Sequence, residues 1–170
     1  MAVSSSPNLT WVVPSLMVFD LPYITSVKYQ KNLYEALDNG ELGRYFKGKF
    51  NEVGLEPIMY GYRDFFSVKK PIRSVGDLAG IQVRTTASVV EVEVAKALGM
   101  KPKPLAWGET YTALKEGIVE GEGNTFSFLL DAEHEDILKY AFASQHNYSM
   151  QILSANKKWW EELDPQVRRH

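Results

Sequence analysis

The sequence contains no cysteine, so it can form neither a disulfide framework nor a cysteine-based zinc site. Excess charge of either sign is also missing, because 19 Lys and Arg face 21 Asp and Glu and the formal net charge is -2. Without a basic stripe, the chain lacks the electrostatic signature of a nucleic-acid-binding protein. No apolar run is long enough to cross a bilayer. We therefore expect no nucleic-acid partner and no direct membrane insertion.

Catalytic patterns are equally scarce. The three histidines, His134, His146 and His170, form no pair at helical spacing, and the sequence has no nucleophile elbow and no His-Glu-x-x-His motif. His134 lies between two glutamates and is expected to be solvated, and Glu120 and Glu122 are expected to be exposed on a strand. The sequence thus predicts no metal, no cofactor and no enzymatic activity.

What is present is an ordinary globular composition, with 45% hydrophobic and 24% charged residues in 170 residues. This length suits one large domain or two small lobes. Helical spacing of apolar residues alternates with short strand-like runs, which is typical of an α/β fold. Helices are expected over residues 26–38, 41–53, 88–98, 106–117 and 125–138, strands over 55–62, 81–86, 100–105, 118–124, 140–144 and 148–155, and an irregular extended passage over 7–24.

Arg84 is the main candidate for a binding residue. Ile81 and Val83 alternate with polar neighbours in a short strand, and Arg84 stands at its C-terminal end, where α/β proteins place ligands. A helix is expected to begin a few residues later, and its free N–H groups would reinforce an anion site. The guanidinium fork can hold a carboxylate through two hydrogen bonds. The alternative is a surface arginine in a salt bridge.

Further candidates have alternatives of their own. Arg63, among aromatic residues, is either a second cationic contact or an edge-strand arginine stacked on Tyr62 or Phe65. Trp107 either lines a cleft or packs on the first turn of its helix. Asn124 either binds a ligand or caps a helix. The glycines before it do not complete a phosphate loop, so no nucleotide site is expected. Phe65, Phe66, Trp107 and Phe128 hint at an apolar or aromatic acid as ligand, although some of them must belong to the core.

Four segments carry a resemblance to a known family. Residues 71–84, with the run Gly-Ile-Gln-Val-Arg, and residues 97–124, with Trp-Gly-Glu-Thr-Tyr, are the longest, and residues 19–23 and 156–160 also match. Together they resemble the solute-binding proteins of tripartite ATP-independent periplasmic (TRAP) transporters, the DctP-like family. The resemblance covers nearly the whole chain.

This resemblance implies a periplasmic receptor of two α/β lobes, with a type II-like periplasmic binding protein fold. Its partners would be a small organic acid, such as a dicarboxylate, and the membrane subunits of a TRAP transporter. Lobe two would comprise residues 61–149, and residues 1–60 and 150–170 would form an incomplete lobe one. Because family members are substantially longer and no signal peptide is visible at Met1, we expect the chain to be an internal piece.

The resemblance also implies roles for individual residues. Arg84 would pair with the ligand carboxylate, and the loop around Ser5 would face the ligand from lobe one. The other positions that match binding residues of the family are Arg63, Trp107 and Asn124. Thr125 departs from the family pattern, which has proline there, and this loosens the backbone beside Asn124.

The expected function is therefore capture of a carboxylate-bearing solute and its delivery to a transporter. Three alternatives remain open at this stage: a sensor domain of similar two-lobe fold that binds the same solutes, an enzyme on an α/β scaffold, and a truncated chain that does not bind ligand.

Overall fold

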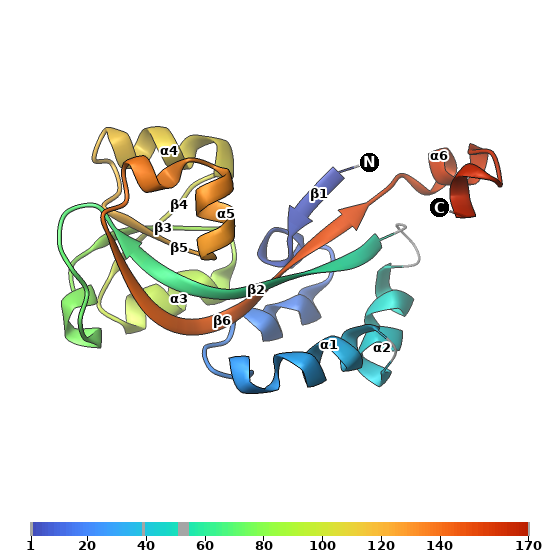
Figure 1. Cartoon of the computed structure of the whole chain (residues 1–170), viewed down its shortest axis with the longest axis horizontal. Coiled ribbons are helices and arrows are strands. Elements are labelled where there is room, and N and C mark those ends of the chain that lie inside the picture. Colours follow the sequence, from blue (N-terminus) through green and yellow to red (C-terminus); the bar gives the residue numbers. More distant parts are fainter. Residues whose placement is uncertain (1, 39, 51–54, 170) are drawn as a thin grey trace.

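The computed structural model describes residues 2–38, 40–50 and 55–169, which form a mixed α/β fold around one six-stranded sheet with the order β1-β6-β2-β5-β3-β4 (Figure 1). The strands are β1 (Ala2–Ser5), β2 (Leu55–Ser67), β3 (Gln82–Thr85), β4 (Lys101–Pro104), β5 (Gly121–Asn124) and β6 (Tyr140–Ser154). β6 pairs antiparallel with β1 and β2, and β2 with β5, whereas β3 pairs parallel with β4 and β5. The expected α/β class is confirmed.

β2 and β6 are long strands that run side by side through both halves of the molecule (Figure 1). Their register shifts twice, between Met59 and Gly61 and between Arg63 and Phe65. Gly61 has a φ of +152°, a conformation that favours glycine, and Gln145 on β6 has a φ of +45°. The two strands expected over 140–144 and 148–155 are therefore one strand with an irregularity at Gln145.

The half of the sheet that contains β3, β4 and β5 has helices on both faces. α3 (Val89–Ala97) lies on one side, and α4 (Trp107–Lys115) and α5 (Phe126–Asp131) lie on the other (Figure 1). Consecutive residues of a strand point to opposite faces, so Phe65 enters the core that contains Ala95 of α3, and Phe66 enters the core that contains Leu114 of α4. These two cores hold the parallel strands between the helices.

The other half packs 3₁₀ turns and two helices on the far ends of β2 and β6. The turns are η1 (Ser6–Leu9), η2 (Pro14–Asp20) and η3 (Val27–Tyr29), and the helices are α1 (Gln30–Asp38) and α2 (Glu41–Phe50). The expectation that the passage over 7–24 is extended is wrong, because much of it forms 3₁₀ turns. Pro7 and Pro14 stand at the start of 3₁₀ turns, where a missing N–H costs nothing. Leu16 and Phe19 of η2 are buried in the third core, with Met150.

Other helix boundaries differ in extent from the expected ones. The helix expected over 125–138 ends at Asp131, because Glu133 adopts a left-handed conformation with φ +59°, and η5 (His134–Asp136) follows it. The helix expected over 41–53 corresponds to α2, and the expected residues 51–53 lie outside the described part of the chain. The C-terminal segment forms α6 (Lys157–Glu162) and η6 (Val167–Arg169). Two short 3₁₀ turns, η4 (Val75–Leu78) and η5, belong to the larger half. No described helix combines the length and apolarity needed to cross a membrane.

Candidate ligand-binding site

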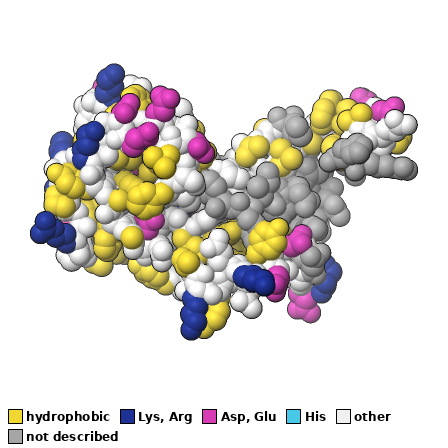
Figure 2. Space-filling view, viewed as in Figure 1, with side chains coloured by type: hydrophobic (Ala, Val, Ile, Leu, Met, Phe, Trp, Pro, Cys, Tyr) yellow, Lys and Arg dark blue, Asp and Glu magenta, His cyan; other side chains and the backbone are white. Residues whose placement is uncertain are grey.

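A cavity lies between β1 and the helix-covered half of the sheet, and its volume is about 540 Å³ including the part open to solvent. In Figure 2 the surface is indented between these two parts of the molecule. The cavity is lined by Val3, Ser4, Ser5, Asn8, Arg63, Arg84, Thr86, Trp107, Asn124, Phe128, Ser149 and Gln151. Six of the seven residues that the sequence selected therefore lie together here, although the chain from Ser5 to Phe128 spans more than a hundred positions.

Arg84 is buried in the cavity wall, with 4% of its surface exposed. Its Nε and Nη2 donate to the Leu105 carbonyl at 3.1 and 2.9 Å, and its guanidinium carbon lies 5.6 Å from the centre of the Trp107 ring. Burial, and then the charge of Arg63, lowers the pKa of Arg84, but an arginine keeps its charge in proteins. Because no described carboxylate forms an ion pair with it, the alternative of a surface salt bridge is wrong, and this buried cation suits an incoming anion.

Arg63 lies at the back of the same cavity and already has a counter-ion. Its Nη1 is 2.8 Å from Glu91 Oε1, its Nη2 donates to the Gly123 carbonyl, and 4% of its surface is exposed. β2 is an interior strand, so the alternative of an edge-strand arginine is wrong. Arg63 thus presents a positive charge whose position is fixed by β5 and α3.

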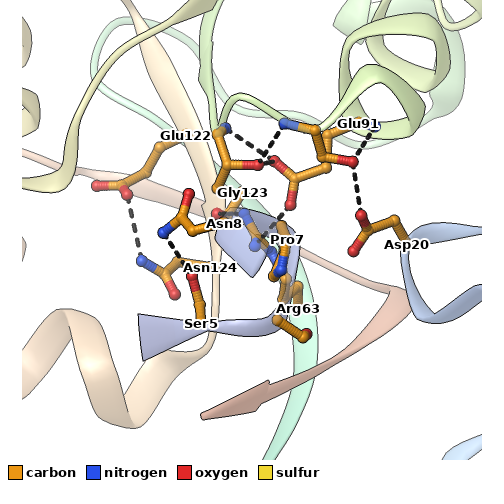
Figure 3. A network of polar contacts seen from close by, with 12 residues as sticks. Ser5, Pro7, Asn8, Asp20, Arg63, Glu91, Glu122, Gly123 and Asn124 are labelled. Carbon is orange, nitrogen blue, oxygen red and sulfur yellow. Dashed lines mark hydrogen bonds and ion pairs between the residues drawn. The ribbon is translucent and has the colours of Figure 1, made fainter. Parts of the chain in front are cut away.

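The start of α3 organises a second layer of polar groups (Figure 3). Glu91 Oε2 accepts hydrogen bonds from Thr86 N at 2.9 Å and Thr86 Oγ1 at 2.8 Å. Ser88 is the N-cap of α3 and donates through Oγ to Asp20 Oδ2 at 2.6 Å. Asp20 comes from η2, so this bond joins the two halves of the molecule. The expected helix N-terminus beside Arg84 is confirmed, and Thr86 connects it to the cavity.

Burial shifts the ionisation of two groups in this layer. Asp20 is 1% exposed, and burial, then the charge of Glu91, raises its pKa to about 7. His146 is 7% exposed, and burial, then the charge of Arg63, lowers its pKa to about 3. His146 is therefore neutral at pH 7, whereas Asp20 exchanges its proton near that pH.

We expect Asp20 to make the stability of the chain fall as the pH rises. Since the pKa of Asp20 is higher in the folded chain than its ordinary 3.8, the folded state holds the proton more tightly, and its contribution is lost between pH 4 and about 7. The loss is at most about 4 kcal/mol. Urea unfolding of the wild type and of Asp20→Asn at pH 4.5 and 8 measures it. Equal pH dependence in the two proteins would contradict the assignment.

Glu122 and His134 form a buried pair of titratable residues beside Trp107, whereas the sequence had suggested that both are exposed to solvent. Glu122 is 0% exposed and His134 is 2% exposed, so the expectation that they face solvent is wrong. His134 Nδ1 lies 2.5 Å from Glu122 Oε1, and its ring stacks on Trp107 with centroids 4.6 Å apart. Asn124 Nδ2 donates to Glu122 Oε2 at 3.4 Å. β5 is an interior strand that is covered on both faces, which is why these groups are buried.

The aromatic candidates separate into two groups. Trp107 is the first residue of α4, and its ring lies 4.7 Å from that of Phe128, so both form one wall of the cavity. Phe65 does not line this cavity. It stacks on His146 at 4.0 Å, packs into a core, and lines a smaller hollow behind Arg63.

Several neutral polar residues of the cavity escaped the sequence analysis. Ser4, Asn8, Thr86, Ser149 and Gln151 all line it. Asn8 Nδ2 also donates to Ser5 Oγ at 3.0 Å, which connects β1 with η1. Their spacing in the chain carries no common pattern, because β1 and β6 meet only through sheet pairing and Thr86 lies between β3 and α3. The alternation of β6 between Ser149 and Gln151 was the one available signal.

The described residues contain no cluster of three or more His, Asp or Glu side chains that could hold a metal ion. The cavity instead combines one buried, unpaired guanidinium with neutral donors and acceptors and an aromatic wall. Such an arrangement can bind and orient a small carboxylate.

Comparison with known proteins agrees with this class of site. The family model described as bacterial extracellular solute-binding protein, family 7 (DctP), matches residues 1–170, and the chain belongs to that family. Members of the family are substrate-binding transport proteins. The C4-dicarboxylate-binding periplasmic protein DctP of Rhodobacter capsulatus is 31% identical over 161 residues, which cover 92% of this chain and 46% of that protein.

Two solved structures have the same fold. A TRAP periplasmic solute-binding protein from Sulfurospirillum deleyianum with bound succinate is 30% identical with a TM-score of 0.88, and the match covers 99% of this chain and 54% of that one. The sugar acid binding protein DctPAm from Advenella mimigardefordensis, in complex with galactonate, is 25% identical with a TM-score of 0.88 and coverages of 98% and 54%. The chain thus spans about half the length of the relatives that it matches.

Proposed function

We propose that this chain is the ligand-anchoring part of a periplasmic receptor that captures a small organic acid and delivers it to a TRAP membrane transporter. The observation that carries this proposal is Arg84, a buried guanidinium in a cavity wall without a carboxylate partner among the described residues. Burying an unpaired charge is costly, so a site of this kind is stabilised by an anion that enters it.

The lining suggests which acids fit. Trp107 and Phe128 supply one flat apolar wall, but Ser5, Asn8 and Asn124 and their neighbours supply hydroxyl and amide groups on the other sides. These groups can pair with ligand hydroxyls, which a simple aromatic acid such as benzoate lacks. We therefore place a hydroxylated acid ahead of the aromatic acid that the phenylalanines had suggested. Galactonate and succinate, bound by the two structural relatives, are suitable first probes.

In this proposal Arg84 holds the ligand carboxylate, Arg63 adds a second positive charge, and Trp107 and Phe128 contact the ligand backbone. Asn124 of β5 and Ser5 of β1 contact its polar groups. No step of bond making or breaking is assigned to any of them, and we propose binding without turnover. Incubation of the protein with the same acids, followed by NMR, would reveal a product if the chain were an enzyme.

We also propose that residues 61–149 form one lobe and that residues 1–60 and 150–170 belong to the other. The separate cores support this division, and so does the register shift where Gly61 pairs with Ser149. The smaller part exposes large apolar side chains, including Trp11 at 82% and Tyr23 at 67%. A lobe that is complete in the longer relatives would cover surface of this kind.

The first test is thermal unfolding with and without a panel of acids. A ligand that binds only the folded state raises its stability by an amount that grows with concentration, about 2.7 kcal/mol at a hundred times Kd. We expect D-galactonate or another hydroxylated acid at millimolar concentration to raise the Tm by several degrees, and benzoate to raise it less. Sodium chloride at the same ionic strength is the control. An unchanged Tm with every acid would contradict the proposal.

A further inference from the structure

Behind the cavity, five buried ionisable groups from five different elements face one another across a small hollow. They are Asp20 of η2, Arg63 of β2, Arg84 of β3, Glu91 of α3 and His146 of β6, and each is at most 9% exposed. Because these five side chains are buried, the sum of their charges matters more than it would at the surface.

When the cavity is empty and both carboxylates are ionised, the charges of these five groups sum to zero. Arg63 and Arg84 carry two positive charges, Asp20 and Glu91 can carry two negative ones, and His146 is neutral at pH 7. An organic acid that binds at Arg84 adds a third negative charge to the same region. One proton on a carboxylate would restore neutrality, which a site of low dielectric constant strongly favours.

Hydrogen bonding decides which carboxylate accepts that proton. Glu91 forms an ion pair with Arg63 at 2.8 Å and accepts hydrogen bonds from two donors of Thr86. Asp20 has one donor, Ser88 Oγ, and its buried Oδ1 accepts no hydrogen bond from any residue that the structure describes. Asp20 is therefore the group whose charge is least stabilised. The remaining nearby carboxylate, Glu122, lies opposite Arg84 in the pairing of β3 with β5 and is hydrogen-bonded to His134.

We propose that Asp20 takes up one proton from solvent when the receptor binds a singly charged organic acid, so that anion and proton enter the buried site together. This inference rests on the proposed function. The step balances: the O–H or N–H bond of a buffer acid breaks, its proton is transferred, and one O–H bond forms on Asp20. Asp20 acts here as a positioning residue, because it acts on the ligand through the Arg63 and Glu91 charges and does not line the cavity.

Linkage gives this idea a measurable consequence. The pKa of Asp20 is about 7 without ligand, and a bound anion raises it further. Between these two pKa values each bound anion draws nearly one proton, and affinity falls by up to about tenfold per pH unit. Below pH 6 Asp20 is already protonated, and affinity no longer depends on this group.

The experiment is titration calorimetry of the whole chain with D-galactonate, D-erythronate and D-glucuronate, each a single anion near neutral pH. Measuring the binding heat at pH 8 in phosphate and in Tris, whose ionisation enthalpies differ, counts the protons that are taken up. We expect nearly one proton per anion and a loss of affinity of three- to tenfold per pH unit from pH 7 to 8.

Two variants separate Asp20 from other carboxylates. Asp20→Asn should take up no proton and bind with nearly constant affinity from pH 6 to 8. Asp64→Asn is the matched control, because Asp64 is also buried with a raised pKa but accepts from Gln145 N at 2.8 Å and lines neither hollow. It should behave as the wild type does.

A direct measurement keeps the inference testable if Asp20→Asn does not fold. In wild-type protein labelled with ¹³C at the aspartate carboxyl carbon, one resonance should shift to the protonated position when galactonate is added at pH 8. Binding without proton uptake, or uptake that persists in Asp20→Asn, would overturn the inference and leave the proposed function intact. Failure of all three acids to bind the wild type at pH 6 would overturn both.

Discussion

Replacing Arg84 by alanine is expected to weaken binding of a hydroxylated acid by roughly 2–5 kcal/mol, the range for removing one member of a buried ion pair. This corresponds to about 30- to 5,000-fold in Kd. The side chain is fixed by two hydrogen bonds to the Leu105 carbonyl and by the face of the Trp107 ring. Because it is already ordered without ligand, binding loses little further side-chain entropy. Titration calorimetry with galactonate measures the loss.

Two further variants sharpen the Arg84 result. Arg84→Lys keeps the charge but loses the planar fork, so it should recover only part of the affinity. Arg73→Ala removes an exposed arginine outside the cavity and should leave Kd unchanged. If Arg84→Ala bound as tightly as the wild type while remaining folded by circular dichroism, Arg84 would not be the carboxylate anchor.

Replacing Arg63 by methionine should destabilise the fold by about 3–5 kcal/mol, because it leaves Glu91 as a buried and unpaired charge. It also removes the donor to the Gly123 carbonyl. The free energy of unfolding from urea titration at pH 7.5 measures the effect. The loss should exceed that of Arg73→Met, since Arg73 is exposed.

A second substitution distinguishes a buried ion pair from lost packing. Adding Glu91→Gln to Arg63→Met removes the orphaned charge while keeping an acceptor for the two donors of Thr86. The double variant should therefore regain more than half of the lost stability, yet bind galactonate more weakly than the wild type because the second cation is gone. A double variant that is less stable than Arg63→Met alone would show that the pair is not the main contribution.

Local sequence patterns were sufficient for the elements near the site. The alternation of Ile81 and Val83, the cap at Ser88 and the position of Arg84 at a strand end were all readable, because each depends on residues only a few positions apart. The family resemblance then brought Arg63, Trp107 and Asn124 together. The structure places all of them around one cavity.

Burial was harder to infer than secondary structure. His134, flanked by glutamates, and Glu122, in a Gly-rich strand, both look solvent-exposed by composition. They are buried because β5 is an interior strand and η5 folds back over α4. Their hydrogen bond satisfies two buried polar groups that the sequence pattern alone would place in water.

By itself, the sequence determined that this protein has an α/β fold, that it lacks cysteine and a basic surface, and that an arginine stands where a strand gives way to a helix. Only the tertiary structure decided which charges are paired. Arg63 forms an ion pair with Glu91, whereas Arg84 forms none with any described carboxylate. The pairing of β2 with β5 and the position of α3 fix the distances between these charged groups. Coulomb energies depend on the distance between charges and on their burial, and local sequence determines neither.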